Sequence, residues 1–507
     1  MSRRLAAAGL LLFAAGCAVG PNYRRPSAPV PSAFKELAPT PTPTPVAGQA
    51  EWKAATPRDD GLRGKWWEIF GDPELSALEE QVNVSNQNVA RAEAVFRGAR
   101  AAARGARGDF FPTVGATASV TRSNSGVARS VSPGTTTQYQ VSADLSWELD
   151  VFGRIRRNVE SNVEAAQASA ADLEAVRLAL QAELAVDYFL LHGLDAQKQL
   201  LDSNVAAYQT ALQLTINRFN QGIVSGVDVA QAQTQLETTR AQATDLSLTR
   251  AQLEHAIAIL TGKPPAELTI AAAPITVTPP AVPVALPSEL LERRPDVAAA
   301  ERRVAAANAQ IGVAVAGFFP RLLLAASGGY GSSTLSKLFS VPNRFWSLGP
   351  SLMETIFEGG KRRAAKEQAE AVYDESVATY RESVLAAFQA VEDNLAALRI
   401  LDVEAGQLAD AVAAAERSLA IARNRYNGGV TTYLEVITAQ SAALANERAA
   451  VDILTRRMTA SVNLVAALGG GWNASDLPNG FEVLSRRDTA PGSEPRAERA
   501  PVSERPR

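Results

Sequence analysis

Very few side chains in this 507-residue chain are of the types that carry out metal, redox or nucleophilic chemistry. The sequence has one cysteine, Cys17, and two histidines, His192 and His255, which are too few for a disulfide or a Cys/His metal cluster within the chain. Each histidine stands alone in a helical pattern, as packing or surface histidines do. Gly359-Gly360-Lys361 lacks the upstream glycine of a phosphate-binding loop. We therefore expect no enzyme activity, no metal and no cofactor.

The composition excludes further classes of protein. Basic and acidic residues number 50 and 53, so the chain lacks the positive charge of a nucleic-acid-binding protein. A hydrophobic fraction of 46% is ordinary, which argues against a bundle of membrane helices. The length exceeds that of one compact core, so we expect several units or one elongated shape.

The N-terminus has the pattern of a targeting signal. Arg3 and Arg4 precede the apolar run Leu5–Ala15, which is too short to span a bilayer but fits a secretory signal. Cys17 follows directly after small residues, and this arrangement resembles a bacterial lipobox. That resemblance implies a signal peptide over 1–16, lipid attachment at Cys17 and sorting to the outer membrane. A plain signal peptide with an incidental cysteine is the alternative. The Pro- and Thr-rich stretch that follows predicts an extended tether over 17–60.

Three short motifs recur about 208 residues apart, which predicts two tandem structural repeats. The motif pairs are Phe110-Phe111-Pro112 with Phe318-Phe319-Pro320, Arg218–Gly222 with Arg425–Gly429, and Ala258–Gly262 with Ala466–Gly470. A Pro-rich stretch separates the copies, and a charged, Pro-containing segment ends the chain. The predicted boundaries are 61–262 for the first repeat, 263–290 for the linker, 291–471 for the second repeat and 472–507 for a disordered tail.

Each repeat contains a pair of candidate strands. Residues 114–120 and 139–151 alternate apolar and polar side chains over the length that a membrane barrel strand needs. The second copy alternates less clearly, and we expect Pro350 to bend or bulge its strand. The phenylalanines at 110, 111, 318 and 319 precede the strands, where an interfacial aromatic belt would lie. A soluble, half-buried sheet is the alternative interpretation of this pattern.

Very long helices follow the strands. Ile155–Gln221 contains no proline and repeats apolar residues at three- and four-residue spacing, and an unbroken helix of this length would reach roughly 100 Å. Its charged residues place it in water. Gly222 and Gly428-Gly429 are suited to ending the two long helices. Ser225–Asp228 and Thr432–Glu435 have the form of capping boxes for the returning helices.

Four strands per chain cannot form a closed wall, so other copies must complete it. Two copies would give about eight strands and a filled interior, whereas three would give about twelve and room for water. Because polar residues line one strand face, we favour a homotrimer, although a tetramer stays open. The predicted fold class is α+β: a trimeric outer-membrane β-barrel continuous with a long periplasmic α-helical barrel.

The chain resembles the TolC-like outer-membrane efflux channels, specifically their NodT-type lipoprotein branch. The motifs that carry the resemblance are Cys17–Tyr23, Trp66–Phe70, Glu289–Val297, Ala305–Gly312, Phe318-Phe319-Pro320 and Ile356–Lys361. The resemblance implies a passive exit duct for drugs or toxic compounds, with a periplasmic adaptor and an inner-membrane pump, often of the resistance-nodulation-division class, as partners. A non-conducting envelope scaffold and the channel of a type I protein secretion system are the alternatives.

The resemblance also implies roles for residues at the far ends of the long helices. The adaptor contacts would be Arg218 and Gly222 in the first copy, and Arg425 and Gly429 in the second. The candidate gate residues are Asp228, Tyr426 and Glu435. The alternative roles for these residues are helix termination and capping. Thr438 stands where related channels often carry another carboxylate.

Overall fold

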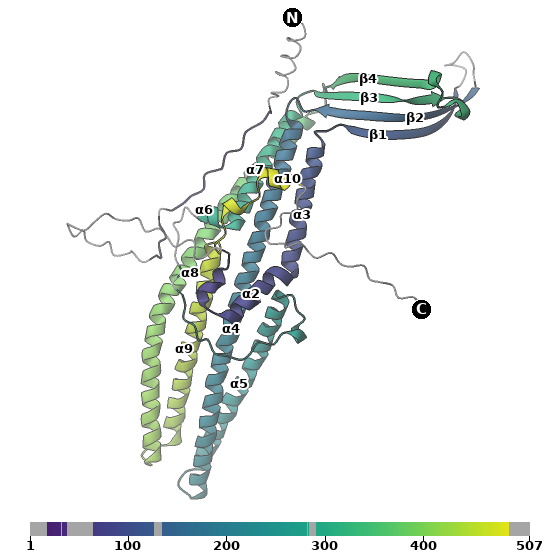
Figure 1. Cartoon of the computed structure of the whole chain (residues 1–507). Helices are drawn as coiled ribbons and strands as arrows, with labels where there is room; N and C mark the ends of the chain where they lie inside the picture. Colours follow the sequence, from purple (N-terminus) through teal and green to yellow (C-terminus); the bar gives the residue numbers. More distant parts are fainter. Residues whose placement is uncertain are drawn as a thin grey trace, which may run out of the picture.

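A computed structural model of the chain describes residues 18–31, 33–37, 64–125, 134–280, 282 and 290–485. A four-stranded sheet lies at one end, and a long bundle of helices extends away from it (Figure 1). Cys17, the predicted signal peptide, the Pro39–Pro45 stretch and residues 486–507 lie outside the described residues.

The sheet is antiparallel, with the strand order β1-β2-β3-β4. The strands are β1 (Thr113–Ser125), β2 (Gly134–Leu149), β3 (Arg321–Ser332) and β4 (Arg344–Met353). The central pairing of β2 with β3 joins the two halves of the chain. Pro350 pairs with Leu324 in an unbroken register, so the predicted bulge is wrong. Within the described residues, β4 is an edge strand paired only with β3, and such a strand tolerates a proline.

Helices of equal length occur in the two halves of the chain. The major helices are α3 (Gln87–Gly108), α4 (Arg154–Asn220) and α5 (Gly226–Leu260), followed by α7 (Pro295–Ala316), α8 (Lys361–Asn427) and α9 (Tyr433–Ala467). α4 and α8 each span 67 residues, so the predicted bounds of the first long helix were correct to within one residue. Among the described residues, no helix combines the length and apolarity needed to cross a membrane.

Shorter elements pack around the middle of the bundle. They are η2 (Trp66–Phe70), α2 (Pro73–Ser85), η3 (Pro265–Glu267), α6 (Leu290–Arg293), η7 (Ala474–Asp476) and α10 (Gly480–Leu484). Two further short turns, η5 (Leu335–Lys337) and η6 (Val341–Asn343), lie instead in the connection between β3 and β4. In the middle of the bundle, Trp66 and Trp67 are almost fully buried against apolar residues of α4 and α9. This cluster is the largest apolar core of the described chain and fixes the helices about halfway along their length.

Charged residues brace the junction between the sheet and the helices. Glu148 at the end of β2 forms two hydrogen bonds, of 2.8 and 2.9 Å, with Arg154 in the first turn of α4. The Asp150 carboxylate accepts the backbone N–H groups of Ile155 and Arg156, both at 2.9 Å. Gly153 makes the turn between strand and helix with a φ of +81°, a conformation that favours glycine. These contacts fix the direction in which α4 leaves the sheet.

The N-terminal segment, part of the predicted extended tether over 17–60, is packed on the helices at the residues that the structure describes. Ala18 lies against Gly153 at the junction, and farther along Phe34 is buried against Phe388 of α8. The Glu392 carboxylate accepts the backbone N–H groups of Lys35 and Glu36 at 2.7 and 2.9 Å. Satisfied backbone groups and a buried phenyl ring therefore hold residues 18–31 and 33–37 on the helices.

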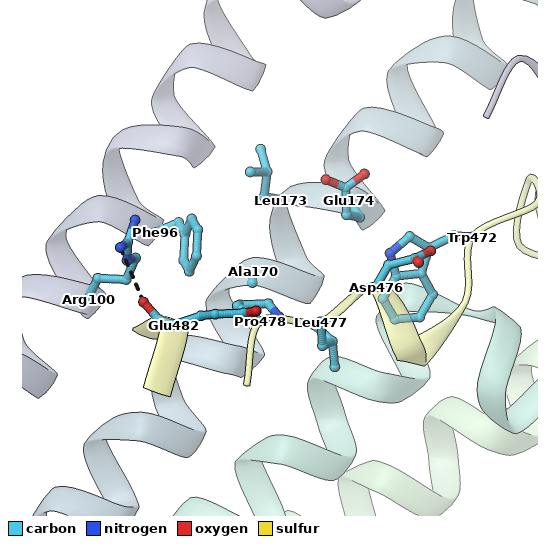
Figure 2. A pocket seen from close by; sticks show the side chains of 10 residues that line it. All are labelled: Phe96, Arg100, Ala170, Leu173, Glu174, Trp472, Asp476, Leu477, Pro478 and Glu482. Carbon is cyan, nitrogen blue, oxygen red and sulfur yellow. Dashed lines mark hydrogen bonds between the residues drawn. The ribbon is translucent and has the colours of Figure 1, made fainter. Parts of the chain in front are cut away.

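The predicted tail over 472–507 began too early, because residues 472–485 are packed. Val483 is fully buried, and Arg100 of α3 donates to the carbonyl oxygens of Glu482 and Ser485 at 3.4 and 3.3 Å. Figure 2 shows this segment beside a cavity of about 280 Å³ between α3 and α4, with Phe96 and Arg100 on one side and Trp472 on the other. The segment is a packing element that fastens α3 to α4.

Candidate functional site

The turn between α4 and α5 is the first of two hairpin tips at the end of the bundle farthest from the sheet (Figure 1). Gly222 adopts a φ of +73° after the last turn of α4, and Ile223 donates its N–H to the Arg218 carbonyl at 2.9 Å. The Asp228 carboxylate accepts the backbone N–H and the hydroxyl of Ser225, both at 2.9 Å. Asp228 therefore caps the start of α5.

The turn between α8 and α9 has the same backbone path, but its acidic residue, Glu435, makes a different interaction from Asp228. Gly429 adopts a φ of +72°, and Val430 donates to the Arg425 carbonyl at 2.9 Å. Thr432 makes no side-chain cap among the described residues, so the predicted capping box is wrong here. Glu435 instead lies 3.4 Å from the guanidinium of Arg425, which draws the carboxylate away from the helix start.

One arginine connects the two tips. Arg218 donates to the carbonyl oxygens of Tyr426 and Asn427, both at 3.1 Å, and its guanidinium carbon lies 4.8 Å from the centre of the Tyr426 ring. A cation at the C-terminal end of α8 complements the partial negative charge of the helix terminus. We call this set of interactions the tip contact. It combines charge-assisted hydrogen bonds with a cation–π interaction.

Aromatic packing supports the tip contact. The Tyr426 and Tyr433 rings lie 5.2 Å apart within a small apolar cluster that also includes Ala232 of α5. Burial raises the pKa of Tyr433 to about 12, and its neighbours Tyr426 and Tyr208 act in the same direction. The Tyr433 hydroxyl therefore stays neutral over the physiological pH range. The cluster joins residues of both hairpins.

The structure brings some of the predicted site residues together and separates others. Arg218 and Tyr426 are in direct contact, and Arg425 pairs with Glu435. Asp228 faces its own helix start. Gly222 and Gly429 lie at the two turns, where a Cβ would meet no described atom within 4 Å.

Sequence reasoning missed the apolar residues exposed at the tips. Ile223 and Val430, which directly follow the two turn glycines, are 64% and 71% exposed, and Leu434 is 56% exposed. An apolar residue after the glycine in both turns was a signal available in the sequence. Beside them, a groove of about 510 Å³ runs between α8 and α9 and is lined by residues that include Arg425 and Glu435. Exposed apolar side chains beside a charged groove are typical of a protein-docking surface.

Comparisons with known proteins give a consistent result along most of the chain. Residues 78–263 and 286–470 match the family described as outer membrane efflux protein. The chain is 32% identical over 470 residues to the solvent efflux pump outer membrane protein SrpC of Pseudomonas putida, covering 92% of this chain and 97% of SrpC. It is 32% identical over 471 residues to the outer membrane protein OprJ of Pseudomonas aeruginosa, covering 92% and 95%.

Solved structures show the same arrangement of elements. The outer-membrane channel OprN superposes with a TM-score of 0.81 at 31% identity, covering 90% of this chain and all of the OprN chain. The open state of the MtrE outer membrane channel of Neisseria gonorrhoeae superposes with a TM-score of 0.78 at 27% identity, covering 90% and 99%. Both comparisons include the sheet and the long helices together.

Proposed function

This chain belongs to the outer membrane efflux protein family, and we propose that three copies of it close a water-filled duct through the outer membrane and the periplasm. As a member of the family it is an outer-membrane efflux channel, which conducts solutes passively and catalyses no reaction. The observation that supports the ring most directly is the open sheet. In the part of the chain that the structure describes, β1 and β4 each have one unpaired edge, and unpaired edges are not tolerated in hydrocarbon.

Three copies would supply twelve strands, enough for a solvated lumen, and identical copies close such a ring by rotation. We further propose that residues 61–262 and 291–471 are tandem repeats joined by the linker over 263–290. Equal lengths of corresponding helices support this proposal: 22 residues for α3 and α7, 67 for α4 and α8, and 35 for α5 and α9.

We propose that residues 1–16 are removed as a signal peptide and that Cys17 carries a lipid. The described neighbour of Cys17 supports this position for an anchor. Ala18 lies against Gly153, and Val19 donates its N–H to the Phe152 carbonyl at 3.1 Å, where the sheet meets the helices. A lipid on the preceding residue would enter the membrane beside the sheet.

The hairpin tips are the proposed contact with a periplasmic adaptor protein, through which an inner-membrane pump delivers substrate. Arg218, Gly222, Arg425 and Gly429 shape the two turns, while Ile223 and Val430 supply exposed apolar contact area. Replacing Ile223 and Val430 with serine should abolish crosslinking to the adaptor in cells and leave the trimer intact. The matched control is Leu248→Ser on α5, where the leucine is 61% exposed but lies away from the tips. Normal crosslinking of the tip variant would refute the assignment.

The proposed gate is the tip contact between Arg218 and Tyr426, with Glu435 as the more exposed acid and Asp228 as a helix cap. Constriction of the duct would require the two hairpins of each copy to stay together, and the tip contact holds them so. The relatives named above include a solvent efflux protein, and we propose that this duct likewise passes small organic toxicants. The chain's pump partner would select among them.

Single-channel recording of the purified protein in planar bilayers tests the duct. We expect discrete conductance steps that grow longer or more frequent when Arg218 is replaced. Absence of steps at every voltage, including in the Arg218→Ala variant and in a variant with Asp228 and Glu435 neutralised, would favour the scaffold interpretation instead. Mass photometry of the same samples establishes whether the silent protein is trimeric.

A further inference from the structure

The two open edges of the sheet continue directly into two different helices. α3 ends at Gly108 and leads into β1, whereas β4 ends at Met353 and leads into α8. α3 and α8 lie on opposite flanks of the bundle in Figure 1, α3 beside α4 and α8 beside α9. Any rotation that joins β4 of one copy to β1 of the next therefore brings α8 of the first copy alongside α3 of the second.

The face of α3 that points away from α4 contains glycines that nothing in the described chain explains. A Cβ at Gly98 or Gly105 would meet no described atom within 4 Å, although glycine inside a helix lowers helix stability. Two glycines inside other helices do have such a reason. A Cβ at Gly193 would collide with Thr455, and one at Gly312 would collide with Arg157. If a second helix packed closely on α3, a side chain at Gly98 or Gly105 would collide with it, and glycine would be required there too.

Unpaired positive charge flanks these glycines. Arg97 and Arg104 are seven residues apart, so they lie on one side of α3, and both are at least partly exposed. Within the described part of the chain, neither forms a hydrogen bond or an ion pair. By contrast, the buried Arg100 binds the carbonyls of the C-terminal segment.

The exposed face of α8 has the complementary pattern. Ala364, Ala371 and Ala378 recur every seven residues and are all exposed. Glu367 and Asp374, also seven residues apart, flank this row of alanines. The Glu367 side chain is 67% exposed and forms a long, solvent-exposed salt bridge of 3.6 Å with Arg363 of the same helix, and Asp374 is exposed. On α8, a row of small side chains is flanked by acids, whereas on α3 the small residues are flanked by arginines. The two faces are therefore complementary in shape and in charge.

The two helices also match in depth. α3 runs toward the sheet and α8 runs away from it, so their packing would be antiparallel. Arg104 and Glu367 lie about 6 Å and about 9 Å from the sheet ends of their helices, at 1.5 Å per residue. Arg97 and Asp374 lie about 17 Å and about 20 Å from those ends.

We propose that α3 of one copy packs against α8 of the next through Gly98, Gly105 and the alanine row, and we call this contact the α3–α8 seam. Arg104 pairs with Glu367 of the next copy, and Arg97 pairs with its Asp374. The seam rests on the proposed ring of copies and adds to it the residues that set its register. Charge complementarity of this kind favours correct partners and suppresses wrong ones.

Charge reversal in the full-length, detergent-purified protein tests the seam by mass photometry. Arg97→Glu with Arg104→Glu should lower the trimer-to-monomer ratio on the order of tenfold, as should Glu367→Arg with Asp374→Arg. All four substitutions together should restore the ratio. The control, Arg24→Glu with Lys35→Glu, makes the same change in net charge at exposed positions of the N-terminal segment and should have no effect.

Two outcomes separate the seam from the ring itself. A wild-type protein that stays monomeric would refute the ring, and the seam with it. The seam alone would be refuted if the wild type is trimeric but charge reversal leaves its trimer-to-monomer ratio unchanged. It would also be refuted if the variant with all four substitutions fails to recover the wild-type ratio.

A crosslink gives an independent measurement of register. Cys17 is the only native cysteine, so Gly105→Cys with Ala364→Cys introduces one new pair. We expect oxidation to give covalent dimers and trimers, because a disulfide requires the two Cα atoms to lie within about 7 Å. Oxidised protein that contains only single chains would contradict the proposed register.

Discussion

The two hairpin tips carry nearly the same residues at corresponding positions but use them differently. In the first tip, Asp228 is bound to Ser225 of its own turn, and Arg218 reaches across to the other hairpin. In the second tip, Arg425 and Glu435 pair with each other within one hairpin, at 3.4 Å. The first arginine therefore connects the hairpins, whereas the second stays within its own.

This difference shows that equal motifs need not have equal roles. Arg218 meets the end of α8, where carbonyl oxygens lack helical partners, and there it satisfies two of them. The side chains of Arg425 and Glu435 are 51% and 47% exposed, so solvent screens their attraction. We therefore expect Arg218 to contribute more than Arg425 to the stability of the closed tips.

The largest effect should come from replacing that arginine. Arg218→Ala removes two charge-assisted hydrogen bonds and the cation–π contact, a loss of about 2 kcal/mol at this partly exposed site. That loss corresponds to an increase in open probability of roughly thirtyfold in single-channel recordings.

Arg425→Ala is the matched comparison at the other tip. Its exposed ion pair contributes at most about 1 kcal/mol, so its open probability should change by less than about fivefold. Equal effects of the two alanine variants would show that the tips do not differ as the geometry indicates.

Two substitutions at Tyr426 distinguish the contribution of its aromatic ring from that of its hydroxyl group. The Tyr426 hydroxyl is buried without a hydrogen-bond partner among the described residues, while its ring lies under Arg218 and beside Tyr433. Tyr426→Phe should therefore leave the conductance unchanged, whereas Tyr426→Leu, which lacks the π face, should raise the open probability by roughly fivefold. A large effect of the phenylalanine variant would mean that the hydroxyl binds a group in another copy.

The sequence predicted the tip architecture better than it predicted the tip chemistry. The turns at Gly222 and Gly429 follow from local backbone rules, because a helix end with positive φ favours glycine. The connection from Arg218 to Tyr426 joins residues 208 positions apart, and no local rule determines such a contact. The capping motif failed at Glu435 for the same reason, since Arg425 approaches it from a different helix.

The same limit applied at the two termini of the chain. A Pro-containing composition predicted an extended tether and a disordered tail, but Phe34 and Val483 are buried. One apolar residue among polar neighbours is enough to anchor a segment when the backbone also finds partners, as it does at Glu392 and Arg100. Composition describes the average of a segment and does not show such single anchors.

Asp228 should affect helix stability more than gating. Asp228→Ala removes the acceptor for the Ser225 N–H and costs about 1 kcal/mol of local stability at the start of α5. Hydrogen exchange of the first turn of α5 should accelerate about fivefold, with little change in open probability. Asp228→Asn keeps an oxygen acceptor and should recover most of the protection. Unchanged exchange in the alanine variant would contradict the capping role.

Glu435 should give the smallest effect, and its direction is informative. Glu435→Gln removes the charge that pairs with Arg425 but opens no buried site, because both side chains are about half exposed. The free energy of the closed state relative to the open state should change by less than about 0.5 kcal/mol. This change should disappear at high salt, because exposed ion pairs are screened. Open probability measured at low and at high ionic strength tests both expectations. An effect larger than that of Arg218→Ala, or one that persists in 1 M salt (Debye length about 3 Å), would place the controlling charge in the second tip and reverse the comparison between the two hairpins.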